Sequence, residues 1–153
     1  MNDQYKNSYK ATAKELVSLS VYNVGYQLCD AGYQWGPGIR DHYLIHYVIS
    51  GKGTYEVNNE THFLSAEDAF LVYPNTEIIY RADAKTPWEY AWVGFTGSDA
   101  ATILQATDFS RKHPCIHAVP NGEEVKRQLL HIYDARGNGF EPVSYTHLTL
   151  PTK

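Results

Sequence analysis

The segment DHYLIHYVISGKGTYEV, residues 41–57, carries the clearest structural signal in this chain. Side chains of alternating character run from Tyr43 to Ile49, a period of two that is typical of a β-strand. Gly51-Lys52-Gly53 follows, and two glycines separated by one residue can adopt the positive φ angles of a tight turn. Thr54 to Val57 then resumes the extended pattern. The segment therefore predicts two consecutive strands joined by a tight turn.

The same pattern of short apolar runs, broken by Gly, Pro, Asn and Asp, extends in both directions from Tyr22 to Phe95. Asn58-Asn59 suits a two-residue hairpin turn, and Asp30–Asp41, with Trp35 at its middle, is expected to be a loop. So many short strands at close spacing predict a β-barrel or sandwich. The expected strands are Tyr22–Leu28, Tyr43–Ile49, Thr54–Val57, Thr61–Leu64, Ala69–Tyr73, Glu77–Arg81 and Trp88–Phe95.

Beyond Phe95 the pattern becomes helical. Ser98 and Asp99 can cap a short helix that begins at Ala100, and a brief extended piece is expected at Cys115–Val119. A longer amphipathic helix is predicted from Pro120 to Asp134. Its apolar stripe must be covered either by the barrel or by a second copy of the helix, and as a dimer interface it would use Val125, Leu129, Ile132 and Tyr133.

The two ends of the chain lack these patterns. Residues 1–20 are polar and poorly periodic, which indicates either a flexible arm that closes over a pocket or a disordered terminus. Residues 141–153 continue no pattern and are expected to be a non-native or disordered tail. The expected organisation is therefore an arm at 1–20, a barrel at 21–96, a truncated helical dimerisation region at 97–140 and a tail at 141–153.

Composition limits the classes of function. With 153 residues and 43% hydrophobic content, the chain can fill one core. A formal charge of −4 provides no basic excess for binding phosphates, so this chain alone is not expected to bind DNA. Two cysteines, no signal-peptide pattern and no apolar run of roughly 18 to 20 residues indicate a reduced, cytoplasmic protein that is not in a membrane. Thirteen Tyr and three Trp favour a pocket or an interface.

Three segments together resemble the N-terminal, arabinose-binding-like domain of AraC-type transcription regulators. They are DHYLIHYVISGKGTYEV at 41–57, AEDAFLVYPN at 66–75 and PWEYAWVGFTGSDA at 87–100, in the order and spacing of that family. The resemblance covers roughly residues 21–134. It implies a mainly β fold: a cupin-like jelly-roll barrel that holds a small-molecule effector, usually a sugar, followed by α-helices that pair two subunits. The helix-turn-helix domain through which such regulators read DNA is not in this sequence.

The resemblance also implies ligand contacts on the strand at 88–95. Alternation puts Trp88, Tyr90 and Trp92 on one face, and aromatic rings can pack against the C–H face of a pyranose. The alternative for these three side chains is a core or an interface. His46 matches a polar lining position of the family, or is a structural histidine; Arg40 could bind vicinal hydroxyls, or is an exposed charge. The candidate ligand-binding residues are Trp92, Tyr90, His46, Tyr80, Arg40 and Trp88.

The sequence fits neither a cupin metal site nor a nucleophilic cysteine site. Metal-dependent cupin enzymes use a His-x-His pair, a Glu and a further His, whereas here His42 and His46 are four apart and no histidine follows the turn at Pro74. Cys29 and Cys115 have no pattern that marks a base beside them. We therefore expect no catalytic residue, metal or cofactor. The leading hypothesis is a sugar-sensing domain; a metal-dependent isomerase or dioxygenase and a dimerisation module without a ligand remain the alternatives.

Overall fold

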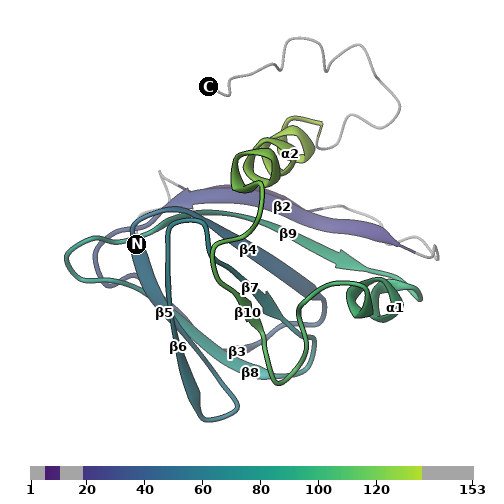
Figure 1. Cartoon of the computed structure of the whole chain (residues 1–153), viewed down its shortest axis with the longest axis horizontal. Helices are drawn as coiled ribbons and strands as arrows, with labels where there is room; N and C mark the ends of the chain where they lie inside the picture. The colour runs from purple at the N-terminus through teal and green to yellow at the C-terminus, as the bar shows by residue number, and fades with distance from the viewer. Residues whose placement is uncertain (1–5, 11–18, 136–153) are drawn as a thin grey trace.

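The computed structural model describes residues 6–10 and 19–135 (Figure 1). Most of the expected arm and the whole expected tail, residues 1–5, 11–18 and 136–153, lie outside the described residues. Among the described helices, none is long and apolar enough to cross a membrane.

The described chain forms two antiparallel sheets that face each other. The six-stranded sheet has the order β1-β2-β9-β4-β7-β10, and the four-stranded sheet has the order β3-β8-β5-β6. The strands are β1 Lys6–Lys10, β2 Ser20–Leu28, β3 Gln34–Ile39, β4 Tyr43–Ser50, β5 Lys52–Val57, β6 Glu60–Ser65, β7 Ala69–Val72, β8 Glu77–Ala82, β9 Glu89–Thr96 and β10 Cys115–Ile116.

Strands β2 to β9 form a jelly roll. Four of them, β2, β9, β4 and β7, lie side by side in one sheet, and the other four, β3, β8, β5 and β6, lie in the other. Chain neighbours such as β2 and β3 therefore lie in opposite sheets, as in two interlocked Greek keys. The expected mainly β, cupin-like jelly roll with C-terminal helices is confirmed.

The turns follow from their residues. Asn58 and Asn59 have φ angles of 54° and 65° and join β5 to β6, so the predicted two-residue hairpin is confirmed. Asparagine tolerates this left-handed region better than most residues because its short polar side chain can bond locally. Gly51 has φ 75°, and an added Cβ there would collide with the backbone of Pro87. A glycine is required at this position because both the angle and the space exclude a side chain.

Two sequence expectations need correction. Residues 30–41 were expected to be a loop, but Gln34–Ile39 is strand β3 at the edge of the four-stranded sheet. Its pairing with β8 shifts register between Trp35 and Gly38, and an edge strand with such an irregularity tolerates Pro37. Likewise, no regular structure was expected within residues 1–20, an arm or a disordered terminus, whereas Lys6–Lys10 is strand β1, paired along its length with β2.

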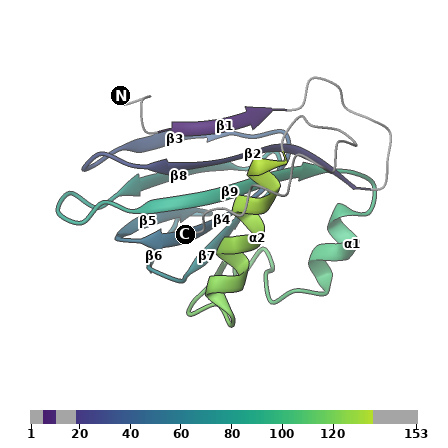
Figure 2. The same ribbon diagram turned by 90° about the horizontal axis from the view of Figure 1, so that it is seen from above.

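The space between the sheets is the main core. Alternate residues of each strand point into it, and its members include Leu44, Tyr55, Phe70 and Trp88. The outer face of the six-stranded sheet is covered by two helices, α1 (Ala100–Gln105) and α2 (Gly122–Asp134). Helix α2 crosses β2, β9 and β4 (Figure 2).

The segment that leads into α2 is fixed to the barrel at Asp68. This carboxylate is buried and accepts hydrogen bonds from the backbone N–H groups of Ser65 and Ala118 and from Nδ1 of His117, at 2.8, 2.9 and 3.1 Å. The backbone N–H of Val119 donates to the carbonyl oxygen of Glu67 at 2.8 Å. These bonds set the position from which α2 begins.

Candidate ligand-binding site in the barrel

The aromatic face of β9 points into the barrel, as its alternation predicts. Trp88, Tyr90 and Trp92 have exposed fractions of 0%, 2% and 7%. In the sheet register Trp92 pairs with His46 of β4 on one side and with Gly25 of β2 on the other. Because paired residues share a face, these three positions form one interior row.

His46 lies at the centre of this interior. Its imidazole is 1% exposed and contacts four aromatic rings from three other strands. The distances between ring centroids are 4.4 Å to Phe70, 4.8 Å to Tyr90, 4.9 Å to Tyr80 and 5.9 Å to Trp92. The structure thus brings His46, Tyr80, Tyr90 and Trp92 together in one cluster.

Arg40 joins the cluster from the connection between β3 and β4. Its Nη2 donates a hydrogen bond of 3.0 Å to the Tyr80 hydroxyl oxygen, and its guanidinium carbon lies 3.8 Å from the ring centroid of Trp35. The Trp35 ring in turn stacks on Tyr80, with centroids 5.6 Å apart and planes 13° apart. Arg40 is therefore a half-buried, oriented donor and not the exposed charge of the alternative interpretation.

A second donor of Arg40 makes no hydrogen bond with the described residues. Its Nε is buried and has no hydrogen-bond partner among the described residues. A buried donor without an acceptor costs about 1–3 kcal/mol, and more when it is charged. An acceptor oxygen on a ligand would remove that cost.

Tyr80 is neutral at physiological pH. Burial raises the pKa of its phenol to about 12, although the neighbouring Arg40 acts in the opposite direction. Since the phenol oxygen accepts from Arg40, its own proton remains for donation to another oxygen. Arg40 and Tyr80 together offer the donors that a polyhydroxylated ligand needs.

Trp88 lies deeper than the other candidates. Its ring stacks on Phe70 at 5.7 Å between centroids, and a Cβ added to Gly53 would come within 2.6 Å of it. These contacts favour the core interpretation for Trp88 and leave Trp92, which is closer to the surface, as the better ligand platform.

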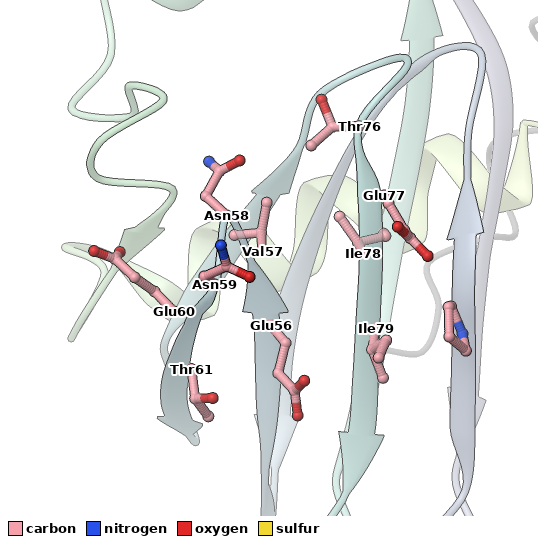
Figure 3. Close-up of a pocket in the computed structure, with 11 residues that line it drawn as sticks. Glu56, Val57, Asn58, Asn59, Glu60, Thr61, Thr76, Glu77, Ile78 and Ile79 are labelled. Atoms are coloured by element: carbon pink, nitrogen blue, oxygen red, sulfur yellow. The ribbon is translucent and has the colours of Figure 1, made fainter.

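Two pockets that described residues line lie elsewhere. They have volumes of about 520 and 530 Å³, both lie along the four-stranded sheet, and neither includes any of the six candidate residues. Figure 3 shows the pocket of about 520 Å³. The candidate side chains fill the interior that they line. A ligand that accepts from Arg40 would lie at the end of the barrel where β3 leads into β4.

Sequence reasoning missed two residues of this site. Trp35 was assigned to a loop, yet it supports Arg40 through its ring face. Asn23 faces the interior opposite Gly94, and its side-chain oxygen is buried without a hydrogen-bond partner among the described residues. The alternation of β2 could have revealed Asn23, because Asn23, Gly25 and Gln27 pair in register with Gly94, Trp92 and Tyr90.

The described residues offer little support for a metal site or for a nucleophilic cysteine. Within residues 6–10 and 19–135, no group of three or more His, Cys, Asp or Glu side chains is placed to hold a metal ion. Burial raises the pKa of the Cys115 thiol to about 12, and Cys29 is buried as well. A thiol with such a pKa is almost entirely protonated at neutral pH and is a poor nucleophile.

The apolar stripe of α2 packs on its own barrel. Leu129 is 7% exposed and lies in a cluster with Tyr47, Ala69 and Ala91 on the outer face of the six-stranded sheet. Val125 packs against the same cluster, and the Tyr133 ring contacts that of Tyr26 edge-on at 5.1 Å. The apolar stripe of α2 is thus covered by the barrel, which is one of the two surfaces that the sequence analysis considered. Pairing of two subunits stays a prediction; it would use Val125, Leu129, Ile132 and Tyr133.

Comparisons with known proteins agree with this geometry. A family model described as the AraC-like ligand binding domain matches residues 20–141. The Msm operon regulatory protein of Streptococcus mutans is 42% identical over 97 residues, which are 63% of this chain and 35% of that protein. The raffinose operon transcriptional regulatory protein RafR of Pediococcus pentosaceus is 37% identical over 116 residues, 74% of this chain and 42% of that protein. The chain thus spans less than half the length of these relatives.

Among solved structures, YhaK of Escherichia coli has a similar fold, with a TM-score of 0.52 at 13% identity over 61% of this chain and 45% of that chain. The cupin domain of Schizosaccharomyces pombe Cnp3 is 15% identical over 71% of this chain and 76% of that chain, with a TM-score of 0.48. Identities of this size concern the fold alone. The match of the family model over most of the chain is decisive: the chain belongs to the family of AraC-like ligand-binding domains.

Proposed function

We propose that this chain senses a saccharide as the effector domain of a transcription regulator. The observation that carries the proposal is the oriented group of Arg40, Tyr80 and Trp35, which adjoins the core cluster that contains Trp92 and in which the buried Nε of Arg40 has no acceptor among the described residues. A sugar supplies hydroxyl oxygens for Arg40 and Tyr80 and a flat C–H face for an indole ring. No residue of this group needs to act as a catalyst.

The names of the relatives suggest the class of saccharide. One is the regulator of a raffinose operon and another, from Staphylococcus xylosus, is the activator of a lactose operon; the latter is 26% identical over 105 residues. Raffinose and lactose both contain a galactose unit. We therefore propose that the effector is a galactose-containing oligosaccharide.

Binding at the end of the barrel would regulate only if the effector favours one arrangement of the protein over another. The parts that could respond are residues 1–20, as an arm over the site, and α2. In the full-length protein we propose a cytoplasmic homodimer whose DNA contacts come from a further domain, as the length of the relatives suggests.

The test is a binding measurement on the purified chain. Titration of raffinose, lactose and galactose, followed by intrinsic tryptophan fluorescence and by calorimetry, should show saturable binding, with maltose as a saccharide without galactose. Arg40→Lys should weaken the affinity about tenfold or more, because an ammonium cannot reproduce the paired donors of a guanidinium. Arg111→Lys is the matched control, since Arg111 also lies over an aromatic ring, that of Tyr73, at 4.2 Å.

The contrary outcomes point to the alternatives. If no saccharide binds at millimolar concentration, or if Arg40→Lys and Arg111→Lys have equal effects, the proposed site is wrong. Stoichiometric iron, manganese or zinc in the purified protein would favour a cupin enzyme. Unchanged thermal stability across the whole panel would favour a dimerisation module, because a ligand that binds only the folded state must raise the melting temperature.

A further inference from the structure

Neither of the two helices in the described residues covers the outer face of the four-stranded sheet. Both helices pack on the other sheet, where Leu129 and Leu104 are buried against it (Figure 1). The two most exposed large hydrophobic side chains in the described part of the chain, Phe63 at 73% and Ile39 at 62%, both belong to strands of this sheet. They point outward, because their neighbours His62 and Gly38 pair along the interior rows.

Charge on this face changes sign along the strands. Phe63, Thr54 and Arg81 form one outward row, and Lys52 continues it toward one end of the sheet. Asp83 also lies at this end, where hydrogen bonds from the backbone N–H groups of Thr86 and Lys85 lower the pKa of its carboxyl and keep it ionised. Its negative charge offsets part of the positive charge of Lys52 and Arg81, so this end of the face keeps a small positive excess.

The opposite end is acidic and hollow. Glu56 and Glu77 extend from β5 and β8 on this face, as Figure 3 shows, whereas Glu60 at the start of β6 lies on the inner row, with its Oε1 3.7 Å from Nε2 of His62. They line the pocket of about 520 Å³, whose other walls include Val57 and Ile79. The pocket therefore has an apolar part that could accept a ring and carboxylates that could meet cations.

We propose that two copies of this chain associate through this face. A two-fold axis that lies in the plane of the face and runs across the strands reverses the strand direction in the second copy. The basic end of each copy then meets the acidic end of the other, and because such an axis places each strand opposite its own copy, Phe63 of each copy faces the part of the hollow that Thr61 of β6 lines. An axis along the strands would instead place like charges together. Such a self-complementary patch is what an isologous dimer requires.

This interface differs from pairing through α2 and does not depend on sugar binding. The α2 stripe is occupied by the barrel, whereas the sheet face offers exposed apolar area, complementary charge and hollows in one patch. A face of only four strands is small, so the association should be weak and sensitive to salt.

Sedimentation velocity over a range of protein concentrations, without saccharide, tests the proposal. The wild-type chain should show a monomer–dimer equilibrium that shifts toward the monomer between low and high salt. Phe63→Ser should weaken the association about tenfold or more, because a central aromatic anchor is lost. Ile103→Ser is the matched control: Ile103 is also exposed, at 44%, but lies on α1, so this variant should dimerise like the wild type.

A charge exchange gives the sharper result. Arg81→Glu and Glu77→Arg should each prevent self-association, and an equimolar mixture of the two should restore a dimer, because each copy then complements the other. Lys112→Glu, an exposed change outside the face, should have no effect. The proposal is overturned if the wild type stays monomeric at all concentrations, if Phe63→Ser leaves the dimer unchanged, or if the mixture associates no better than its components.

Discussion

Replacement of Tyr80 by phenylalanine isolates the polar contact that the candidate site is built around. The change removes one oxygen atom, the acceptor of the 3.0 Å hydrogen bond from Arg40 Nη2, and keeps the ring that stacks on Trp35. Arg40 Nε already lacks a partner, so the variant leaves the guanidinium without the one side-chain acceptor that orients it. Both the fold and the site should suffer.

The magnitude follows from the kind of bond. A hydrogen bond to a charged group contributes about 1.5–3 kcal/mol to the free energy of unfolding, and Tyr80 is 3% exposed, so water does not readily replace the lost acceptor. For a domain of this size, a loss of that order lowers the melting temperature by about 5–10 °C. The saccharide affinity should fall as well, because Arg40 loses its orientation.

Urea unfolding followed by circular dichroism measures this contribution in a double-mutant cycle. The cycle compares wild type, Tyr80→Phe, Arg40→Met and the double variant; methionine keeps an apolar stem over Trp35 while it removes the donors. The coupling energy should be about 1.5–3 kcal/mol. Tyr43→Phe is the control, since Tyr43 stacks on Phe95 through its ring, and it should change stability by less than about 0.5 kcal/mol.

A coupling energy below about 0.5 kcal/mol would contradict the reasoning, because it would fall in the range of exposed pairs, about 0.2–1 kcal/mol. So would a Tyr80→Phe variant that is as stable as wild type and binds a saccharide with unchanged affinity. In either case Arg40 would be a solvated side chain that happens to lie near Tyr80, and the polar half of the proposed site would be lost.

Three further predictions concern other parts of the fold. The pKa of Tyr80 is about 12 in the folded chain and about 10 in the unfolded chain, a difference that contributes about 3 kcal/mol to the free energy of unfolding. This contribution is complete below pH 10 and is lost as the pH rises toward 12. The urea midpoint should therefore fall less steeply across this range in Tyr80→Phe than in wild type. Leu129→Ala should lower the free energy of unfolding by about 2–5 kcal/mol at a protein concentration where the chain is monomeric, and a loss below 1 kcal/mol would mean that α2 does not pack on its own barrel. Cys115, with a thiol pKa of about 12, should resist Ellman's reagent at pH 8 until the chain is unfolded in urea, and rapid labelling of the native protein would show that the thiol is more accessible than the structure has it.

The sequence predicted the strands whose side chains alternate. In β4 and β9 polar or aromatic residues alternate with smaller ones, so the interior positions of His46, Tyr90 and Trp92 could be inferred from period alone. Strand β3 could not be predicted in this way, because Gly36-Pro37-Gly38 has the composition of a turn. Its pairing depends on a register shift and on an edge position, and both are properties of the sheet that no local pattern contains.

The contacts of the site were harder to predict than its location. Arg40 and Tyr80 are forty residues apart and meet only because β3, which ends one residue before Arg40, is the neighbour of β8 in the jelly roll. Local sequence left Arg40 open between a ligand contact and an exposed charge, and Trp35 was placed in a loop. The covering of α2 was open for the same reason: an amphipathic stripe shows that a partner surface exists and not which surface it is.

Two strands connect the proposed effector site with α2. On β4, His46 faces the interior cluster while the next residue, Tyr47, packs outward in the cluster that contains Leu129. On β9, Trp92 faces the interior cluster and its neighbour Ala91 packs outward in the cluster that contains Leu129. A saccharide that shifts Trp92 or His46 would therefore act on the backbone that supports α2, within one residue along each strand. Because coupling is reciprocal, a substitution that loosens α2, such as Leu129→Ala, should change saccharide affinity even though Leu129 lies on the opposite face of the sheet. Equal affinity in that variant and the wild type would restrict the response to other parts of the chain.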